Sequence, residues 1–206
     1  MNLSTRILAT VFAAALACSQ AYSQATPQAE GGFHLLHNVE IGGGAMGTFT
    51  PVLPTGNAGA PQSTTDSFGG LFTFKDHPVA WAGLEFNFGF SEYSERFGSP
   101  ANFRSKTAMD EATGAYLFHP HIRHLQPFVA LGGGYIGFLP VRGEDQWRGT
   151  GLAEVGVDVP TSNRHMGFRF QGRTLVYRAP NFYNGAVGTV NWVATTEPMV
   201  GIWYRW

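Results

Sequence analysis

The stretch Met199-Val-Gly-Ile-Trp-Tyr-Arg-Trp206 is the strongest indicator of fold class in this chain. In an extended strand, successive side chains point to opposite faces. One face of this stretch therefore carries only apolar and aromatic side chains: Val200, Ile202, Tyr204 and Trp206. Ends of soluble domains tend to fray and tolerate polar tails, so such a strand is unusual in water. It fits a closed barrel whose outer surface contacts lipid.

Residues 1–25 have the organisation of a secretory signal peptide. Arg6 opens a short basic region, and the apolar stretch Ile7–Ala17 that follows is too short to span a membrane as a helix. Small residues come next, and we expect cleavage after Ala25, with Ala21 as the alternative site. Residues 26–38 then form a periplasmic segment before the barrel.

Cys18 raises the alternative of a lipoprotein, in which this cysteine is acylated after cleavage. However, Leu16 lies one position too late for the usual sequence before an acylated cysteine. Cleavage after Ala25 removes Cys18, the only cysteine, so we expect the exported chain to have no disulfide and no thiol chemistry.

Composition excludes some classes of function. The chain has 13 basic and 14 acidic residues, a balance that argues against nucleic-acid binding, for which a basic patch is typical. No stretch after the signal peptide approaches the roughly 18 apolar residues of a spanning helix, so membrane insertion would require strands.

Eight segments alternate between apolar and polar side chains. In the clearest, Val79–Ser91, phenylalanines 86, 88 and 90 oppose Glu85 and Asn87, whereas the glycine-rich segment Phe128–Leu139 has no evident facing. About ten residues per segment suffice for a tilted strand to cross a bilayer. We therefore predict an all-β fold, an eight-stranded antiparallel up-and-down transmembrane barrel over residues 39–206, with strands at Val39–Thr50, Asp66–Phe74, Val79–Ser91, Lys106–Phe118, Phe128–Leu139, Gly149–Val159, Met166–Arg178 and Val190–Trp206.

The connections between these segments differ in length by position. Odd-numbered connections are long or intermediate: Pro51–Thr65, Glu92–Ser105, Pro140–Arg148 and Ala179–Thr189. Two even-numbered ones are short and one is longer: Lys75–Pro78, Pro160–His165 and His119–Pro127. This rhythm is typical of barrels with extracellular loops and periplasmic turns. It predicts that both ends of the barrel lie in the periplasm.

With these patterns, the chain resembles the small eight-stranded bacterial outer-membrane barrels, the family of the OmpA transmembrane domain. Gly201, Tyr204 and Trp206 match the C-terminal assembly signal of such proteins, although Met199 stands where a polar residue is usual. The segment Gly167–Arg173 also fits the family. The resemblance implies an outer-membrane location, contact with outer-membrane lipid, biogenesis through periplasmic chaperones and the barrel-assembly machinery, and a monomeric state.

Charged residues on the inward faces predict a filled interior. An eight-stranded barrel is just wide enough to be filled by side chains, and charges removed from water must be paired. The inward acids nearly balance the inward bases, so we predict a network of ion pairs that plugs the lumen. An acid/base pair or a narrow ion path is the alternative. The network comprises Glu40, Glu85, Glu111, Glu154, Asp158, Arg169, Arg173, Glu197 and Arg205, with Lys75 and Arg148 beside them.

All seven histidines precede the first strand or lie near predicted periplasmic turns. They are His34, His37, His77, His119, His121, His124 and His165. The cluster His119-Pro-His-Ile-Arg-His124 suggests a metal site, because imidazole binds transition metals. Its spacing matches no strong ligand motif and no carboxylate or thiolate lies nearby, so we predict polar turn residues, with no metal and no cofactor.

Three other functions compete with a structural or surface-interaction role. A lipid-A-modifying enzyme of the deacylase type would carry His-x-Ser-Asn, but no histidine here has serine two positions later. In a soluble lipocalin-like carrier, the face that bears the charged residues would form the exterior. This chain has far fewer charged residues on that face than the surface of a soluble protein carries. The triple glycines at 42–44 and 132–134 lack the Lys-Ser/Thr of a phosphate loop. We therefore predict a non-enzymatic barrel with a structural role or a surface-interaction role, acting through its extracellular loops on an unidentified ligand. The alternatives are a narrow pore, a lipid-A-modifying enzyme and a soluble lipocalin-like carrier.

Overall fold

The computed structural model describes residues 36, 38–51, 62–79, 81–97, 103–120, 125–163, 165–181 and 191–206. The predicted signal peptide and nearly all of the segment 26–38 lie outside the described residues. The strands are β1 (Val39–Thr48), β2 (Gln62–Thr64), β3 (Ser67–Val79), β4 (Ala82–Phe97), β5 (Phe103–Phe118), β6 (Gln126–Pro140), β7 (Gln146–Pro160), β8 (Met166–Arg178) and β9 (Trp192–Arg205).

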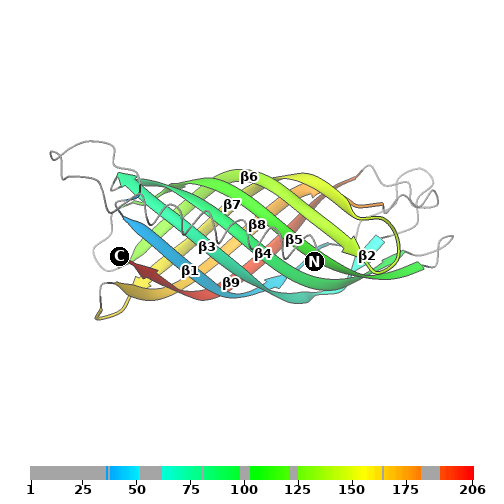
Figure 1. Ribbon diagram of the computed structural model, residues 1–206, viewed down its shortest axis with the longest axis horizontal. Helices are drawn as coiled ribbons and strands as arrows, with labels where there is room; N and C mark the ends of the chain where they lie inside the picture. Colours follow the sequence, from blue (N-terminus) through cyan, green and yellow to red (C-terminus); the bar gives the residue numbers. More distant parts are fainter. Residues whose placement is uncertain are drawn as a thin grey trace.

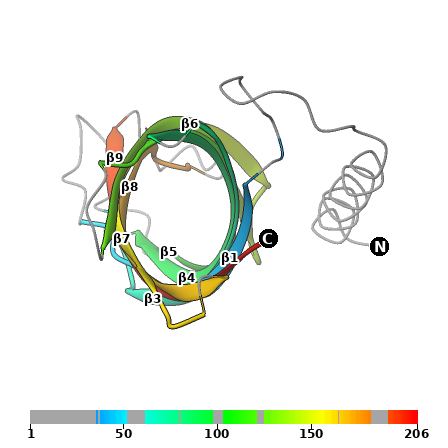
Figure 2. The ribbon, with the colours of Figure 1, turned by 90° about the vertical axis from the view of Figure 1, so that its left-hand side faces the viewer.

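Eight of these strands close into an antiparallel barrel, which confirms the predicted fold. Neighbours along the chain pair in sequence from β3 to β9, and β1 joins β3 on one side and β9 on the other. The β1–β9 register runs from Glu40 opposite Arg205 to Met46 opposite Met199, which completes the ring seen in Figure 2. The short strand β2 pairs with the far end of β4, beyond β3.

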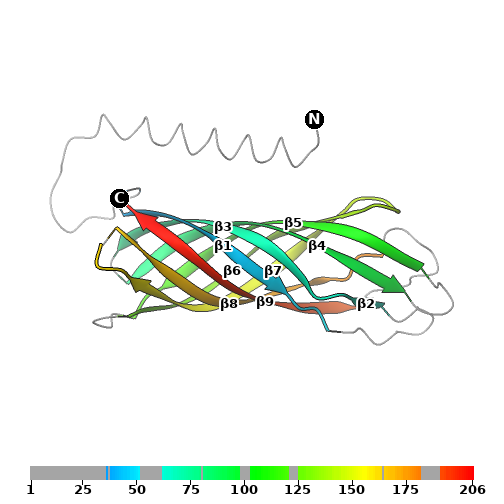
Figure 3. The same cartoon turned by 90° about the horizontal axis from the view of Figure 1, so that it is seen from below.

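The strand ends divide the barrel into two rims. The start of β1 and the end of β9 lie at one rim, together with the turns that join β3 to β4 and β7 to β8 (Figures 1 and 3). We call it the terminal rim. β2 and the junction of β6 with β7 lie at the opposite rim (Figure 1). Both ends of the barrel therefore lie on one side, as an even number of spanning strands requires.

The two faces of the wall differ sharply in polarity. On β4, Phe86 and Phe90 are 47 % and 65 % exposed, whereas Glu85 and Asn87, on either side of Phe86, are fully buried in the interior. The same alternation runs through β8 and β9, where Phe168, Phe170 and Ile202 are exposed. An apolar exterior on a closed barrel is the surface that a transmembrane barrel presents to lipid. This exterior and the fold together confirm the predicted outer-membrane location.

Among the described residues, no helix has both the length and the apolar character needed to cross a membrane.

Several strand boundaries differ from the predicted ones. β3 continues to Val79, so the predicted turn Lys75–Pro78 is wrong and Lys75 lies in a strand. β4 and β5 extend to Phe97 and from Phe103, which shortens the predicted loop Glu92–Ser105. The alternation of apolar and polar residues is weak in these regions. Pro78 is a residue type typical of turns, and the outer parts of β4 and β5 carry charged residues on their exterior face.

The facing of β6, which the sequence left open, is now defined. Phe128, Ala130, Ile136 and Phe138 point into the barrel and are almost fully buried, whereas Leu131 and Tyr135 are exposed outside. Three consecutive glycines at 132–134 separate the two halves of this strand. At Gly132, an added Cβ would lie 2.0 Å from the carbonyl oxygen of Gly114, so close approach of β5 requires glycine here.

Candidate functional site: the charged lumen

Charged side chains inside the barrel form two groups at different depths. The terminal cluster lies near the terminal rim and consists of Glu40, Lys75, Glu85, Asp158, Arg169 and Arg205. The central cluster consists of Glu111, Glu154, Arg173 and Glu197, from the middle of β5, β7, β8 and β9. All of these residues are buried except Arg205, which is half-buried at the mouth.

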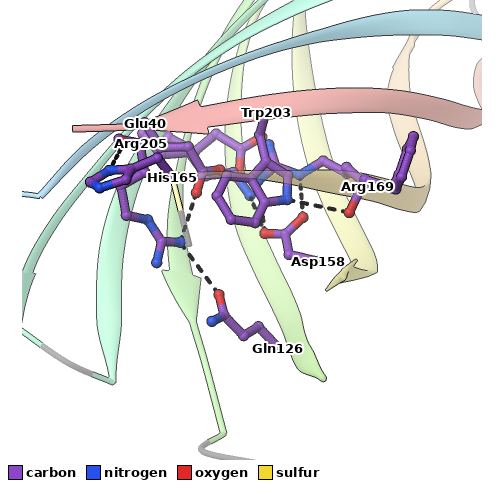
Figure 4. Close-up of polar contacts among 10 residues, drawn as sticks. Glu40, Gln126, Asp158, His165, Arg169, Trp203 and Arg205 are labelled. Atoms are coloured by element: carbon purple, nitrogen blue, oxygen red, sulfur yellow. Dashed lines mark hydrogen bonds and ion pairs between the residues drawn. The ribbon is translucent and has the colours of Figure 1, made fainter. Parts of the chain in front are cut away.

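Arg169 organises the terminal cluster. Its Nε and Nη2 donate to the two carboxylate oxygens of Asp158 at 2.6 and 2.7 Å, the paired geometry that a planar guanidinium favours. Nη2 also contacts Glu40, which reaches it from β1. Arg205 donates to the second oxygen of Glu40 at 2.7 Å and to Gln126 at 3.3 Å (Figure 4). Arg169 and Arg205 thus share one carboxylate, which links β8, β1 and β9.

Lys75 extends this cluster across the interior. Its Nζ lies 3.1 Å from Glu85 and 3.8 Å from Asp158. The same ammonium stands 3.9 Å from the ring centroid of Phe128, and the guanidinium of Arg169 is 5.5 Å from that ring. A desolvated cation over an aromatic face is favourable by roughly 2 kcal/mol. The ring of Phe128 therefore contacts two cations.

The central cluster depends on a single cation. Arg173 Nη1 lies 2.6 Å from Glu111, and its Nε lies 3.6 Å from Glu197. Its Nη2 is 3.4 Å from the hydroxyl of Thr113. The carboxylate of Glu154, opposite Arg173 in the β7–β8 register, is buried and makes no hydrogen bond among the described residues. One guanidinium thus pairs with two carboxylates and stands opposite a third.

The lumen between the central cluster and the opposite rim is filled mainly by aromatic, aliphatic and hydroxyl groups. The ring of Tyr177 packs against Phe138 at 5.5 Å between centroids, and its hydroxyl lies 2.7 Å from that of Thr195. The hydroxyl of Tyr93 donates to Glu95 at 3.0 Å. Side chains therefore occupy the barrel along most of its length.

All nine residues predicted for the lumen network lie in the interior or at its mouth. They are Glu40, Glu85, Glu111, Glu154, Asp158, Arg169, Arg173, Glu197 and Arg205. The structure brings seven of them into direct ion pairs with one another, of which Arg173–Glu197 at 3.6 Å is the longest, and Glu85 into a pair with Lys75. Arg148 lies apart, near the opposite rim, where it donates to Gln146 at 2.8 Å.

Some interior residues were missed by sequence reasoning. Phe128 belongs to the segment whose facing was ambiguous, and the neutral polar residue Gln126 carries no charge signal. Glu95 was assigned to a loop, yet it lies inside the barrel on β4. The alternation that begins at Glu85 reaches Glu95 without a change of phase, and this signal could have identified it.

The residues of the predicted assembly signal divide between the two faces. Tyr204 and Trp206 are exposed on the outside. Gly201 faces inward, where an added Cβ would lie 2.5 Å from the carbonyl oxygen of Gly43 on the neighbouring strand. Trp203, inside the barrel, is almost fully buried and donates its indole N–H to Phe168 at 3.3 Å. Their role in assembly stays a prediction.

The histidines that the structure describes lie at the terminal rim. His77 and His119 face each other with ring centroids 4.9 Å apart, and His119 also packs against Phe128. His165 contacts the carbonyl oxygen of Arg205 at 2.9 Å (Figure 4). Burial, and secondarily the positive charge of Lys75, lowers the pKa of His119 to about 4. His34, His37, His121 and His124 lie outside the described residues.

Across the part of the chain that the structure describes, no group of three or more His, Cys, Asp or Glu side chains is arranged to hold a metal ion. This concerns only one part of the predicted histidine cluster, since His121 and His124 are not described.

The fold is shared with solved outer-membrane proteins, although no protein-family profile and no curated protein matches this chain. OprG from Pseudomonas aeruginosa superposes with a TM-score of 0.55 at 16 % identity, covering 84 % of this chain and 97 % of OprG. AlkL, determined in lipid bilayers, gives 0.58 at 16 % identity, covering 89 % and 96 %. Ail, the attachment invasion locus protein of Yersinia pestis, gives 0.52 at 11 % identity, covering 82 % and 98 %. This chain thus has the fold of the small eight-stranded outer-membrane β-barrels.

Proposed function

We propose that this protein is a non-enzymatic outer-membrane barrel with a sealed lumen, which acts in the envelope as a structural element or through its extracellular loops. One observation carries the proposal: ion pairs from β1, β3, β4, β7, β8 and β9 meet inside the barrel, and all their side chains except that of Arg205 at the mouth are almost completely buried. A water-filled channel would leave such groups hydrated.

The proposed orientation follows from the strand ends. The terminal rim, which carries both ends of the barrel, faces the periplasm, and the opposite rim faces outward. The predicted loops Pro51–Thr65, Glu92–Ser105 and Ala179–Thr189 then extend outside the cell, where loops on a rigid scaffold carry recognition. Large parts of these loops lie outside the described residues, and their ligand is not identified by their sequence.

Several observations support a role without catalysis. The described histidines contact each other, an aromatic ring or a backbone carbonyl, and no serine hydroxyl is bonded to any of them within the described residues. A nucleophile and its base must lie within hydrogen-bond reach. Delivery by periplasmic chaperones, insertion by the barrel-assembly machinery and a monomeric state complete the proposal.

Electrical recording tests the sealed lumen. Purified protein is refolded and inserted into planar bilayers, with a general porin as positive control, before and after proteolysis of the loops. We expect no steady conductance in either state, because the seal lies in the lumen and not in the loops. A stable ohmic conductance from the intact or trimmed barrel contradicts the proposal and establishes the narrow pore in its place.

A further inference from the structure

An open cleft lies at the rim opposite the terminal rim, where two neighbouring strands differ in length. β5 begins at Phe103, but its pairing with β6 begins only at Thr107. The first residues of β5 have no partner on β6, and a cleft of about 490 Å³ lies beside them. Its lining comprises Ser94, Arg104, Ser105, Lys106, Val141 and Arg142.

The charge of this cleft is mostly positive. Arg104, Lys106 and Arg142 are exposed in its wall, and Arg96 stands opposite Arg104 in the β4–β5 register. Glu92 forms an ion pair with Lys106. Two further acids, at 144 and 145, lie exposed on the turn between β6 and β7, outside the lining. The hydroxyl of Ser94 in the lining can add a hydrogen bond, so the cleft suits an anion with several acceptor oxygens.

Hydrogen bonds hold the floor and wall of the cleft in place. Val141 donates its backbone N–H to the carbonyl oxygen of Lys106 at 2.8 Å, and the hydroxyl of Ser105 donates to that of Arg142 at 3.2 Å. Arg104 Nη2 lies 3.4 Å from the hydroxyl of Ser94. The cations are therefore presented on an ordered backbone, which reduces the entropy lost when a ligand binds.

The position of the cleft identifies the surroundings of its ligand. Arg104 and Lys106 lie on the outward face of the wall, the face that carries exposed Phe90 nearer the membrane centre. Lys106 pairs with Ser94, four residues beyond Phe90, which is about 9 Å along the barrel axis for a strand tilted by 45°. That height corresponds to the headgroup layer above an aromatic girdle.

We propose that this cleft binds the phosphate groups of a phosphorylated glycolipid in the outer leaflet. Guanidinium groups match phosphate oxygens in a forked geometry, and the ammonium adds a point charge. Exposed Val141 supplies an apolar side for the lipid portion. The assignment rests on the proposed orientation, in which this rim faces outward. A soluble polyanion is disfavoured, because the cleft opens on the lipid-facing wall.

Binding in detergent micelles tests this site independently of orientation and of the sealed lumen. The refolded full chain in maltoside micelles is titrated with lipid A carrying two phosphates and with the same lipid after phosphatase treatment. Native mass spectrometry or calorimetry gives the two dissociation constants. We expect the phosphorylated lipid to bind at least tenfold more tightly, since each basic side chain near a membrane surface contributes measurably.

Variants connect this preference to the cleft. The triple variant Arg104→Gln/Lys106→Gln/Arg142→Gln should lose about 10- to 100-fold in affinity for the phosphorylated lipid. The matched control Arg178→Gln removes an exposed cation on another strand near the same rim and should bind as the parent protein does. If the triple variant does not refold, Lys106→Gln and Arg142→Gln are tested singly, with about a threefold to tenfold loss expected for each.

Three results overturn the proposal. The first is equal binding of phosphorylated and dephosphorylated lipid by the parent protein, and the second is an unchanged preference in the cleft variants. The third comes from inositol hexakisphosphate, a polyanion without acyl chains. If it binds as tightly as lipid A and loses affinity in the same variants, the cleft is a site for soluble polyanions instead.

Discussion

The terminal and central clusters use the same kinds of residue but differ in charge balance. The terminal cluster sets the bases Lys75, Arg169 and Arg205 against the acids Glu40, Glu85 and Asp158. The central cluster sets one base, Arg173, against three carboxylates. In the first cluster most groups have two partners, whereas in the second one guanidinium is the only cation for three carboxylates and pairs directly with two of them. The same substitution should therefore have different effects in the two clusters.

The largest expected effect is from Arg173→Ala. Removal of the only base leaves buried carboxylates without a partner, and the loss of one member of a buried pair typically costs about 3–5 kcal/mol. We expect the free energy of unfolding to fall by that amount, measured by urea titration of tryptophan fluorescence in lipid vesicles.

Lys75→Met provides the comparison within the terminal cluster. Arg169 still neutralises Asp158 there and only Glu85 loses its ion pair, so the loss should be smaller than for Arg173→Ala. An equal or larger loss for Lys75→Met would show that the difference in charge balance has no energetic consequence.

A pair of isosteric changes should give effects of opposite sign. Glu85→Gln removes the carboxylate that lies 3.1 Å from Lys75, and we expect a loss of about 1–3 kcal/mol in unfolding free energy. Glu154→Gln replaces a buried carboxyl group that forms no hydrogen bond among the described residues, and we expect a change between zero and a gain of about 1 kcal/mol. Both are measured by the same urea titration. A clear loss for Glu154→Gln would mean that this carboxylate is needed as an anion.

The smallest expected effect is the pH dependence of stability that comes from His119, near the terminal cluster. His119 has a pKa lowered to about 4, chiefly by burial. The unfolded chain therefore binds a proton more readily, at its ordinary pKa near 6.5. The contribution of His119 to stability is complete above pH 6.5 and is lost as the pH falls towards 4.

The measurement is a histidine NMR titration of the folded barrel, with His119→Gln to assign the signal. His119 is surrounded by His77, Phe128 and the nearby Lys75, so a proton there would add positive charge beside a balanced cluster. A titration midpoint near 6.5 would contradict the burial of this ring.

Much of the fold follows from patterns that a single strand reveals. The alternation in Val79–Ser91 is enough to separate outward phenylalanines from inward Glu85, because side chains in a strand must change face at each residue. The segment Met166–Arg178 has the same bounds as β8 for this reason. The alternation did not predict the facing of β6, where both faces carry similar residues. It also did not predict the end of β3, because Pro78 lies within this strand without ending it.

The partners within the lumen were not predictable in the same way. The sequence indicates that Arg173 and Glu111 point inward, but their contact depends on register and shear around the whole barrel. The unequal charge of the two clusters is a property of that three-dimensional arrangement. The cleft at Arg104 likewise arises from the unequal lengths of β5 and β6, which the predicted boundaries did not contain.

The separation along the chain of the paired residues has a consequence for the order of folding. Arg169 and Glu40 are 129 positions apart, and Arg205 and Glu40 are 165 apart. Contacts between distant positions form slowly, because closing a long loop costs entropy before any contact compensates for it. We therefore expect hairpins such as β7–β8 to form early. The charges around Glu40 remain hydrated until β1 and β9 meet, so desolvation of that part of the lumen is a late step of folding.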